Sequence, residues 1–120
     1  MAHLARARVL IVEDSADTRA MYAFYFKHLG MEVETAEDAE SALACIHRFH
    51  PDVIVMDIGL PNMPGDQLAV RLRGDKRTKH IRLIAVSGFG RDPSPDAAFD
   101  ACLRKPCLPD DLARVVAKFV

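Results

Sequence analysis

The stretch VIVMDIGLPNMPG (residues 53–65) contains a short apolar run that ends abruptly on an acid. Residues 53–56 are all apolar and lead directly into Asp57, and glycines and prolines follow at positions 59, 61, 64 and 65. An unbroken apolar run containing β-branched residues is typical of a strand that is buried on both faces, as in a parallel sheet. Glycine and proline then prevent the chain from continuing as strand or helix. The stretch therefore predicts a buried parallel strand that delivers Asp57 to the edge of a sheet.

Apolar runs alternate with helix-period segments along the rest of the chain. Strands are expected over residues 8–12, 31–35, 53–56, 83–86 and 101–103, and helices over 15–29, 38–49, 65–73 and from 109 onward. Ser15 is a good N-cap for the first helix, and Gly30 follows its end. Pro109 suits the first position of the last helix. Repeats of strand and helix predict one doubly wound α/β domain over residues 1–120.

Composition excludes several classes of protein. The chain has 120 residues, of which 50% are hydrophobic and 28% charged, as in a soluble globular domain. A net charge of −1 argues against nucleic-acid binding, which normally needs a basic surface. No apolar run is long enough for a membrane span or a signal peptide, so we expect a cytoplasmic protein without membrane contact. Three cysteines without a CxxC pair argue against a disulfide framework.

Polar residues follow the expected strands at the points where these strands end. They are Glu13 and Asp14, Asp57, Ser87 and Gly88, and Lys105 with Pro106. Ligands of open parallel sheets bind at the carboxyl ends of the strands. Each residue has an ordinary explanation when taken alone, such as a helix cap, a turn or a surface lysine. Chance, however, would scatter them over both ends of the sheet, so we expect one site.

Three carboxylates in one site need a positive charge nearby. At about 4 Å and an effective dielectric constant near 20, each pair of like charges costs roughly 4 kcal/mol. Mg²⁺ prefers one or two carboxylates together with water and phosphate oxygens, and Lys105 supplies a fixed positive charge. The pattern therefore predicts a magnesium site that receives a phosphoryl group.

This set of residues resembles the receiver domain of two-component response regulators. The resemblance rests on the acidic pair Glu13–Asp14, the motif that follows Asp57, the Ser87–Gly88 pair and the Lys105–Pro106 pair, in that order along nearly the whole chain. It implies a flavodoxin-like fold with five parallel strands in the order 2-1-3-4-5. It also implies a signalling phosphoacceptor in a phosphorelay rather than an enzyme.

The resemblance assigns a role to each residue of the expected site. Asp57 would accept a phosphoryl group from a histidine kinase or a histidine phosphotransfer protein. Mg²⁺ would be bound by Glu13, Asp14, Asp57 and the backbone carbonyl of Gly59. Ser87, Gly88 and Lys105 would bind the phosphoryl oxygens, and the bond before Pro106 would be cis. The signal would pass to an output protein or a fused domain.

Two features depart from the family pattern. The switch position, three residues before Lys105, usually holds an aromatic residue or a histidine but is Cys102 here. We expect this small side chain to be buried in the last strand. In addition, Lys105 lies only 18 positions after Ser87, about one helical turn fewer than the resemblance implies. With Pro93 and Pro95 in this interval, little more than residues 95–100, preceded by a Ser94 cap, remains for a shortened helix four.

Three alternatives belong to other classes of protein. A pseudo-receiver that only binds proteins would keep the fold without phosphorylation. An α/β phosphohydrolase would need a second carboxylate two positions after the nucleophile, where this chain has Gly59. A flavin- or dinucleotide-binding domain would need a loop rich in glycine, serine or threonine after the first strand, whereas VEDSADTR (residues 12–19) is acidic.

Overall fold

The structure is a computed structural model that describes residues 6–88 and 92–120. Its strands are β1 (Arg8–Val12), β2 (Glu32–Ala36), β3 (Val53–Asp57), β4 (Arg82–Ser87) and β5 (Ala101–Arg104). Its helices are α1 (Ala16–His28), α2 (Ala39–Phe49), α3 (Gly65–Arg73), the 3-10 turn η2 (Pro95–Ala97) and α4 (Pro109–Ala117). Strands and helices alternate along the described chain, as the sequence predicts.

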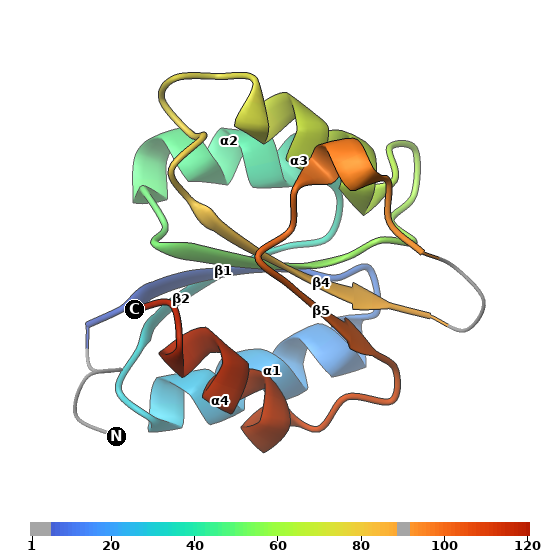
Figure 1. Ribbon diagram of the computed structural model, residues 1–120. Coiled ribbons are helices and arrows are strands. Elements are labelled where there is room, and N and C mark those ends of the chain that lie inside the picture. Colours follow the sequence, from blue (N-terminus) through green and yellow to red (C-terminus); the bar gives the residue numbers. More distant parts are fainter. Residues whose placement is uncertain (1–5, 89–91) are drawn as a thin grey trace.

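The strands form one parallel sheet in the order β2-β1-β3-β4-β5. Helices α2 and α3, with η2, cover one face of the sheet, and α1 and α4 cover the other (Figure 1). All carboxyl ends of parallel strands meet at one edge. The predicted doubly wound fold and its strand order are therefore confirmed.

The sheet is buried on both faces, which explains why its central strands lack polar alternation. All five residues of β3 are buried. Alternate residues of β3 contribute to two separate hydrophobic clusters, with Val53 and Val55 facing α1 and α4, and Ile54 and Met56 facing α2 and α3. Each fully buried aliphatic side chain contributes about 1.5–3 kcal/mol. These clusters hold the strand ends in register at the edge where Asp57 emerges.

The helix ends follow local sequence signals. The Ser15 hydroxyl accepts a hydrogen bond from the backbone N–H of Thr18 at 3.4 Å, which confirms the predicted cap of α1. Pro109 occupies the first turn of α4, where no intrahelical donor is needed. Among the described residues, every helix is too short or too polar to span a lipid bilayer.

The segment between β4 and β5 contains only one short helical element in its described part. The 3-10 turn Pro95–Ala97 stands where the resemblance places helix four. Ser94 occupies the N-cap position of the turn, as predicted, but its side chain makes no capping hydrogen bond. We also expect that no full-length helix four begins near Arg91. That position belongs to residues 89–91, which lie outside the described residues. Within residues 92–100 the shortened helix four is confirmed.

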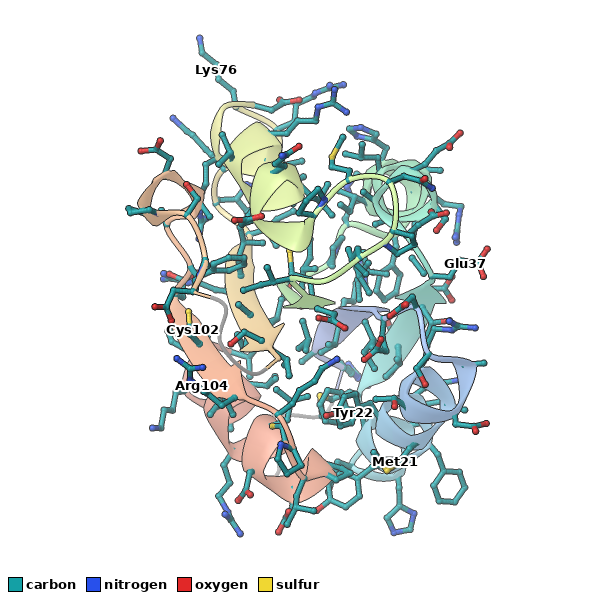
Figure 2. The ribbon with its side chains drawn as sticks, turned by 90° about the vertical axis from the view of Figure 1, so that its right-hand side faces the viewer. Met21, Tyr22, Glu37, Lys76, Cys102 and Arg104 are labelled. Atoms are coloured by element: carbon teal, nitrogen blue, oxygen red, sulfur yellow. The ribbon has the colours of Figure 1, made fainter. Side chains whose placement is uncertain are left out.

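Cys102 is exposed, which corrects the prediction that it is buried. The residues of β5 alternate between half-buried and exposed, and Ala101 and Leu103 turn toward the cluster beneath α1 and α4. Cys102 and Arg104 point to the opposite face at the margin of the sheet (Figure 2). Because one 3-10 turn stands in place of a full helix, the outer part of this face stays open to solvent around Cys102.

Candidate functional site

The carboxyl ends of β1, β3 and β5 bring three acids and one lysine together. Glu13 and Asp14 follow β1, Asp57 is the last residue of β3, and Lys105 follows β5. Glu13, Asp14 and Asp57 each offer one carboxylate oxygen, and these oxygens lie within 4.8 Å of one another. The strand ends are viewed end-on in Figure 2. The structure therefore brings together the three acids that the sequence places at this edge.

Lys105 supplies the positive charge that this cluster needs. Its Nζ lies 2.6 Å from Asp57 Oδ2 and 3.5 Å from Glu13 Oε1. Both carboxylates are buried, with 7% and 4% of their surfaces exposed, whereas the lysine side chain is 38% exposed. A buried carboxylate without a partner would be strongly destabilising, so the lysine compensates for its desolvation.

The surroundings shift the pKa values of Glu13 and Lys105. Burial raises the pKa of Glu13, and the neighbouring Asp14 and Asp57 carboxylates raise it further, while its bond from the Ser15 N–H and the charge of Lys105 oppose the rise. Burial lowers the pKa of Lys105, but the hydrogen bond and charge of Asp57, together with Glu13, outweigh this and leave the pKa raised. The lysine therefore stays cationic at neutral pH.

Backbone groups orient the acids. The Gly59 N–H donates to Asp57 Oδ1 at 2.9 Å, and the Ser15 N–H donates to Glu13 Oε2 at 3.0 Å. Asp57 Oδ1 and Oδ2 thus contact different partners, one a backbone amide and the other an ammonium group. This leaves Asp14, which is exposed, as the acid most open to solvent.

Ser87 and Lys105 lie on adjacent strand ends. Ser87 is buried at the end of β4, and its carbonyl accepts a hydrogen bond from the Lys105 N–H at 2.9 Å. The peptide bond between Lys105 and Pro106 is cis. Gly88 is half-buried, and a Cβ atom added there would contact nothing within 4 Å, which leaves open space beside the lysine.

Arg19 is a site residue that the sequence did not reveal. Its guanidinium donates to the carbonyl of Glu13 at 2.8 Å and reaches that of Asp14 at 3.5 Å. It therefore holds the backbone of the acidic pair from the first turns of α1. Arg19 is half-buried, and an arginine in the first turns of a helix carries no sequence signal that separates this role from simple solvation.

Tyr22 attaches α1 to the loop after Lys105. Its hydroxyl donates to the carbonyl of Cys107 at 2.8 Å, and its side chain points toward the strand ends (Figure 2). Burial raises the pKa of Tyr22 from its usual value near 10 to about 12, and Cys107 and Glu13 add to the rise. The folded state therefore favours the neutral phenol.

In the Tyr22→Phe variant, the free energy of unfolding is expected to fall less steeply at alkaline pH than in the parent chain. The pKa of Tyr22 is higher in the folded state than in the unfolded state. The stabilisation that comes from keeping its phenol neutral is therefore complete below pH 10 and is lost as the pH rises toward 12. Urea unfolding across this range should show a shallower fall for Tyr22→Phe, along with a loss of about 1 kcal/mol at neutral pH from the missing hydrogen bond. Tyr25→Phe is the control, and an equally shallow fall in that variant would contradict the assignment.

Comparisons with known proteins agree with this geometry. Residues 9–117 match the family model described as the response regulator receiver domain. The chain is similar to an uncharacterized 14.6 kDa protein of Leptolyngbya boryana (sodA1 3′ region), with 32% identity over 99% of this chain and 94% of that protein. It is 30% identical to the phosphate regulon regulatory protein PhoB of Escherichia coli, over 92% of this chain but only 50% of PhoB.

Solved structures show the same relationship. The chemotaxis response regulator CheY4 of Vibrio cholerae superposes with a TM-score of 0.86 at 27% identity, covering 97% of this chain and 100% of CheY4. Against PhoB the chain spans only half of the relative's length, so activities of that whole regulator do not transfer. The family match covers nearly the whole described chain, and the site geometry has the acids and lysine that the sequence predicts. The chain therefore belongs to the response regulator receiver domain family.

Proposed function

We propose that residues 1–120 form one receiver domain in which Asp57 accepts a phosphoryl group from a histidine kinase or a histidine phosphotransfer protein. The observation that carries the proposal is the 2.6 Å contact between Lys105 Nζ and Asp57 Oδ2 inside a group of three carboxylates. A lone buried acid would have no such set of partners. The arrangement suits an aspartate that is phosphorylated, because Lys105, which now pairs with the Asp57 carboxylate, can then pair with the phosphoryl oxygens.

The donor set fits Mg²⁺. Glu13, Asp14 and Asp57 offer only oxygen atoms, and the carbonyl of Gly59 completes the proposed set. Hard divalent cations select such ligands, and Mg²⁺ also retains water and phosphate oxygens. When bound, the ion offsets negative charge on the transferred phosphoryl group.

Asp57 acts as a carboxylate nucleophile in this proposal. One of its oxygens forms an O–P bond while the P–N bond of the donor phosphohistidine breaks, and the electron pair of that bond stays on the imidazole nitrogen. Lys105 then pairs with the phosphoryl oxygens, and Ser87 and Gly88 contribute hydrogen bonds beside it. Lys105 thus exchanges a carboxylate partner for a phosphoryl partner without leaving the site.

Phosphorylation would act as a switch of partner binding. Shifting a two-state population from 1:99 to 99:1 takes about 5.5 kcal/mol, whereas one hydrogen bond to a charged group contributes about 1.5–3 kcal/mol. Ser87 alone is therefore insufficient, and the exchange of partners at Lys105 must supply part of the difference. The output is a separate protein or a fused domain, in the cytoplasm where phosphoryl donors derived from ATP are found.

Two other functions remain as outcomes of the test. A pseudo-receiver would bind partners without accepting a phosphoryl group. An α/β phosphohydrolase would turn over a substrate, but Gly59 stands where its acid/base carboxylate is needed. We therefore propose a phosphoacceptor with no catalytic cycle of its own on external substrates.

The experiment is incubation with Mg²⁺ and acetyl phosphate, followed by intact-mass measurement. One phosphoryl adduct is expected, and omission of Mg²⁺ should suppress it. No adduct with acetyl phosphate, or with a phosphorylated histidine phosphotransfer protein, would establish the pseudo-receiver. Continued release of inorganic phosphate from small phosphate esters would establish the phosphohydrolase.

Lys105→Ala is expected to tighten Mg²⁺ binding while slowing phosphoryl uptake. The lysine competes for Asp57 Oδ2 and Glu13 Oε1, so its removal should strengthen Mg²⁺ binding about tenfold, equivalent to roughly 1.4 kcal/mol. Calorimetric titration with Mg²⁺ measures the affinity. Arg104→Ala removes the same charge from the neighbouring residue and should change the affinity by less than about twofold. Equal or weaker Mg²⁺ binding in Lys105→Ala would contradict the competition.

A further inference from the structure

Residues 92–100, which stand in place of helix four, are attached to α3 at two points. Near the start of the segment, the Ser94 N–H donates to Asp66 Oδ2 at 3.1 Å. Near its end, the Arg73 guanidinium donates to the Ala98 carbonyl at 2.8 and 3.2 Å and to Asp100 Oδ2 at 2.9 Å. We refer to Asp66, Arg73, Ser94, Ala98 and Asp100 together as the α3 clamp.

Arg73 is the centre of the α3 clamp. Its side chain is only 20% exposed, and its Nη1 also donates to the carbonyls of Lys79 and Ile81 at 2.8 Å each. Asp100, similarly shielded, accepts a hydrogen bond from the Leu83 N–H at 2.8 Å. Charge-assisted hydrogen bonds shielded from water are stronger than surface ion pairs. The segment is therefore held to α3 and to the start of β4 by the same two side chains.

The unit formed by α3 and residues 92–100 borders the phosphoacceptor on two sides. At its first residue, Gly65, the backbone N–H donates to the carbonyl of Ile58, which directly follows Asp57, at 2.8 Å. On the other side, Arg104, the residue before Lys105, donates to Asp92 Oδ1 at 3.1 Å. Ile58 and Arg104, which are the chain neighbours of Asp57 and Lys105, therefore both contact this unit, Ile58 through a backbone hydrogen bond and Arg104 through an exposed ion pair.

The geometry points to α3 as the element that receives the phosphorylation signal through the α3 clamp, in place of a full helix four. Pro93, Pro95 and a single 3-10 turn leave no long helix in the described part of the segment that could shift as a rigid body. A displacement of residues 92–100 must instead act on α3 through Arg73 and Asp66. This inference rests on the proposed phosphorylation of Asp57.

Hydrogen exchange with intact-mass control tests the inference. The chain is incubated with Mg²⁺ and excess acetyl phosphate, the extent of phosphorylation is measured by intact mass, and exchange is followed in peptides that cover residues 65–73 and 92–100. Phosphorylation is expected to change amide exchange in both regions. In α3 the change should be about fivefold or more, the lower end of typical coupling between sites.

Arg73→Lys and Asp100→Asn are expected to uncouple the two regions. Lysine keeps the charge but lacks the planar guanidinium fork with which Arg73 donates to Ala98 and Asp100 while also holding the carbonyls of Lys79 and Ile81. Asparagine keeps an acceptor for Leu83 while losing the charge. In both variants the phosphorylated fraction and the response of residues 92–100 should persist, while the α3 response falls to below about twofold. Arg71→Lys, the same substitution at an exposed position of α3, should keep the parental α3 response.

The outcomes separate this inference from the proposed function. A phosphoryl adduct without an exchange change in α3 of the parent chain overturns the inference alone, even if neither variant folds. An α3 response that persists in both folded variants also overturns it, because the signal would then pass directly from Asp57 to Gly65. Absence of any adduct overturns the proposed function together with the inference.

Discussion

The Asp57→Asn variant is expected to gain no phosphoryl group under conditions in which the parent chain gains one. The amide is nearly the same size as the carboxylate, so the fold should be kept, but its oxygen is a far weaker nucleophile. Asparagine also removes one negative charge from a group whose oxygens lie within 4.8 Å of one another. Mg²⁺ affinity should therefore fall by about tenfold or more, equivalent to at least about 1.4 kcal/mol.

The matched control is Asp17→Asn, which makes the same chemical change in the exposed first turn of α1. It should be phosphorylated to the same extent as the parent chain. Intact mass measures uptake, and calorimetric titration measures Mg²⁺ affinity. An adduct of equal yield in Asp57→Asn would place the phosphoryl group on another residue and remove the central assignment.

Gly65→Ala is expected to destabilise the fold severely. A Cβ atom at this position would lie 2.3 Å from the backbone oxygen of Asp57 and 3.0 Å from Cα of Ile58. Both atoms belong to the backbone next to the phosphoacceptor and cannot rotate away as a side chain could. We expect a loss of about 3 kcal/mol or more in the free energy of unfolding, measured by urea denaturation, because relief requires α3 to move away from β3.

Gly74→Ala is the control, since it makes the same change at the other end of α3. Its Cβ would meet no atom closer than 3.6 Å, and the residue already has a helical backbone conformation. Alanine there should leave stability unchanged or raise it by about 0.4–1 kcal/mol, because it restricts the unfolded chain. Equal losses in both variants would show that contact with Asp57 is not what requires glycine at position 65.

Several features of the site were predictable because they depend on strand ends alone. In any parallel sheet, the carboxyl ends of the strands lie at one edge. The apolar runs of this sequence stop on Asp57, just before Glu13 and at Ser87, so these residues are expected at that edge. Helix caps such as Ser15 act within one turn and depend on nearby sequence. These predictions needed only the periodicity of apolar residues along the chain and the fact that the strands run parallel.

Cys102 shows where this reasoning fails. Its position in β5 was predictable, but its exposure depends on what covers that face of the sheet. Residues 92–100 form only a 3-10 turn, held toward α3 by Arg73 and Asp66, so the outer face of β5 remains open. Burial is a property of neighbours that are distant in sequence, and local patterns carry little information about them.

The sequence by itself determined the strand order implied by the family resemblance, the acids and lysine at the strand ends, and the shortening of helix four. The strand order follows from the family resemblance, and the shortening of helix four follows from comparing the spacing of the motifs with that family. Only the placement of the acids and the lysine at strand ends follows from hydrophobic period and turn residues, which are local quantities. Only the tertiary structure decided that Lys105 contacts Asp57 at 2.6 Å, that Gly65 is required by its contact with the Asp57 backbone, and that Arg73 joins α3 to residues 92–100. Such contacts join residues far apart in the chain, and their geometry is set by how the sheet and helices pack.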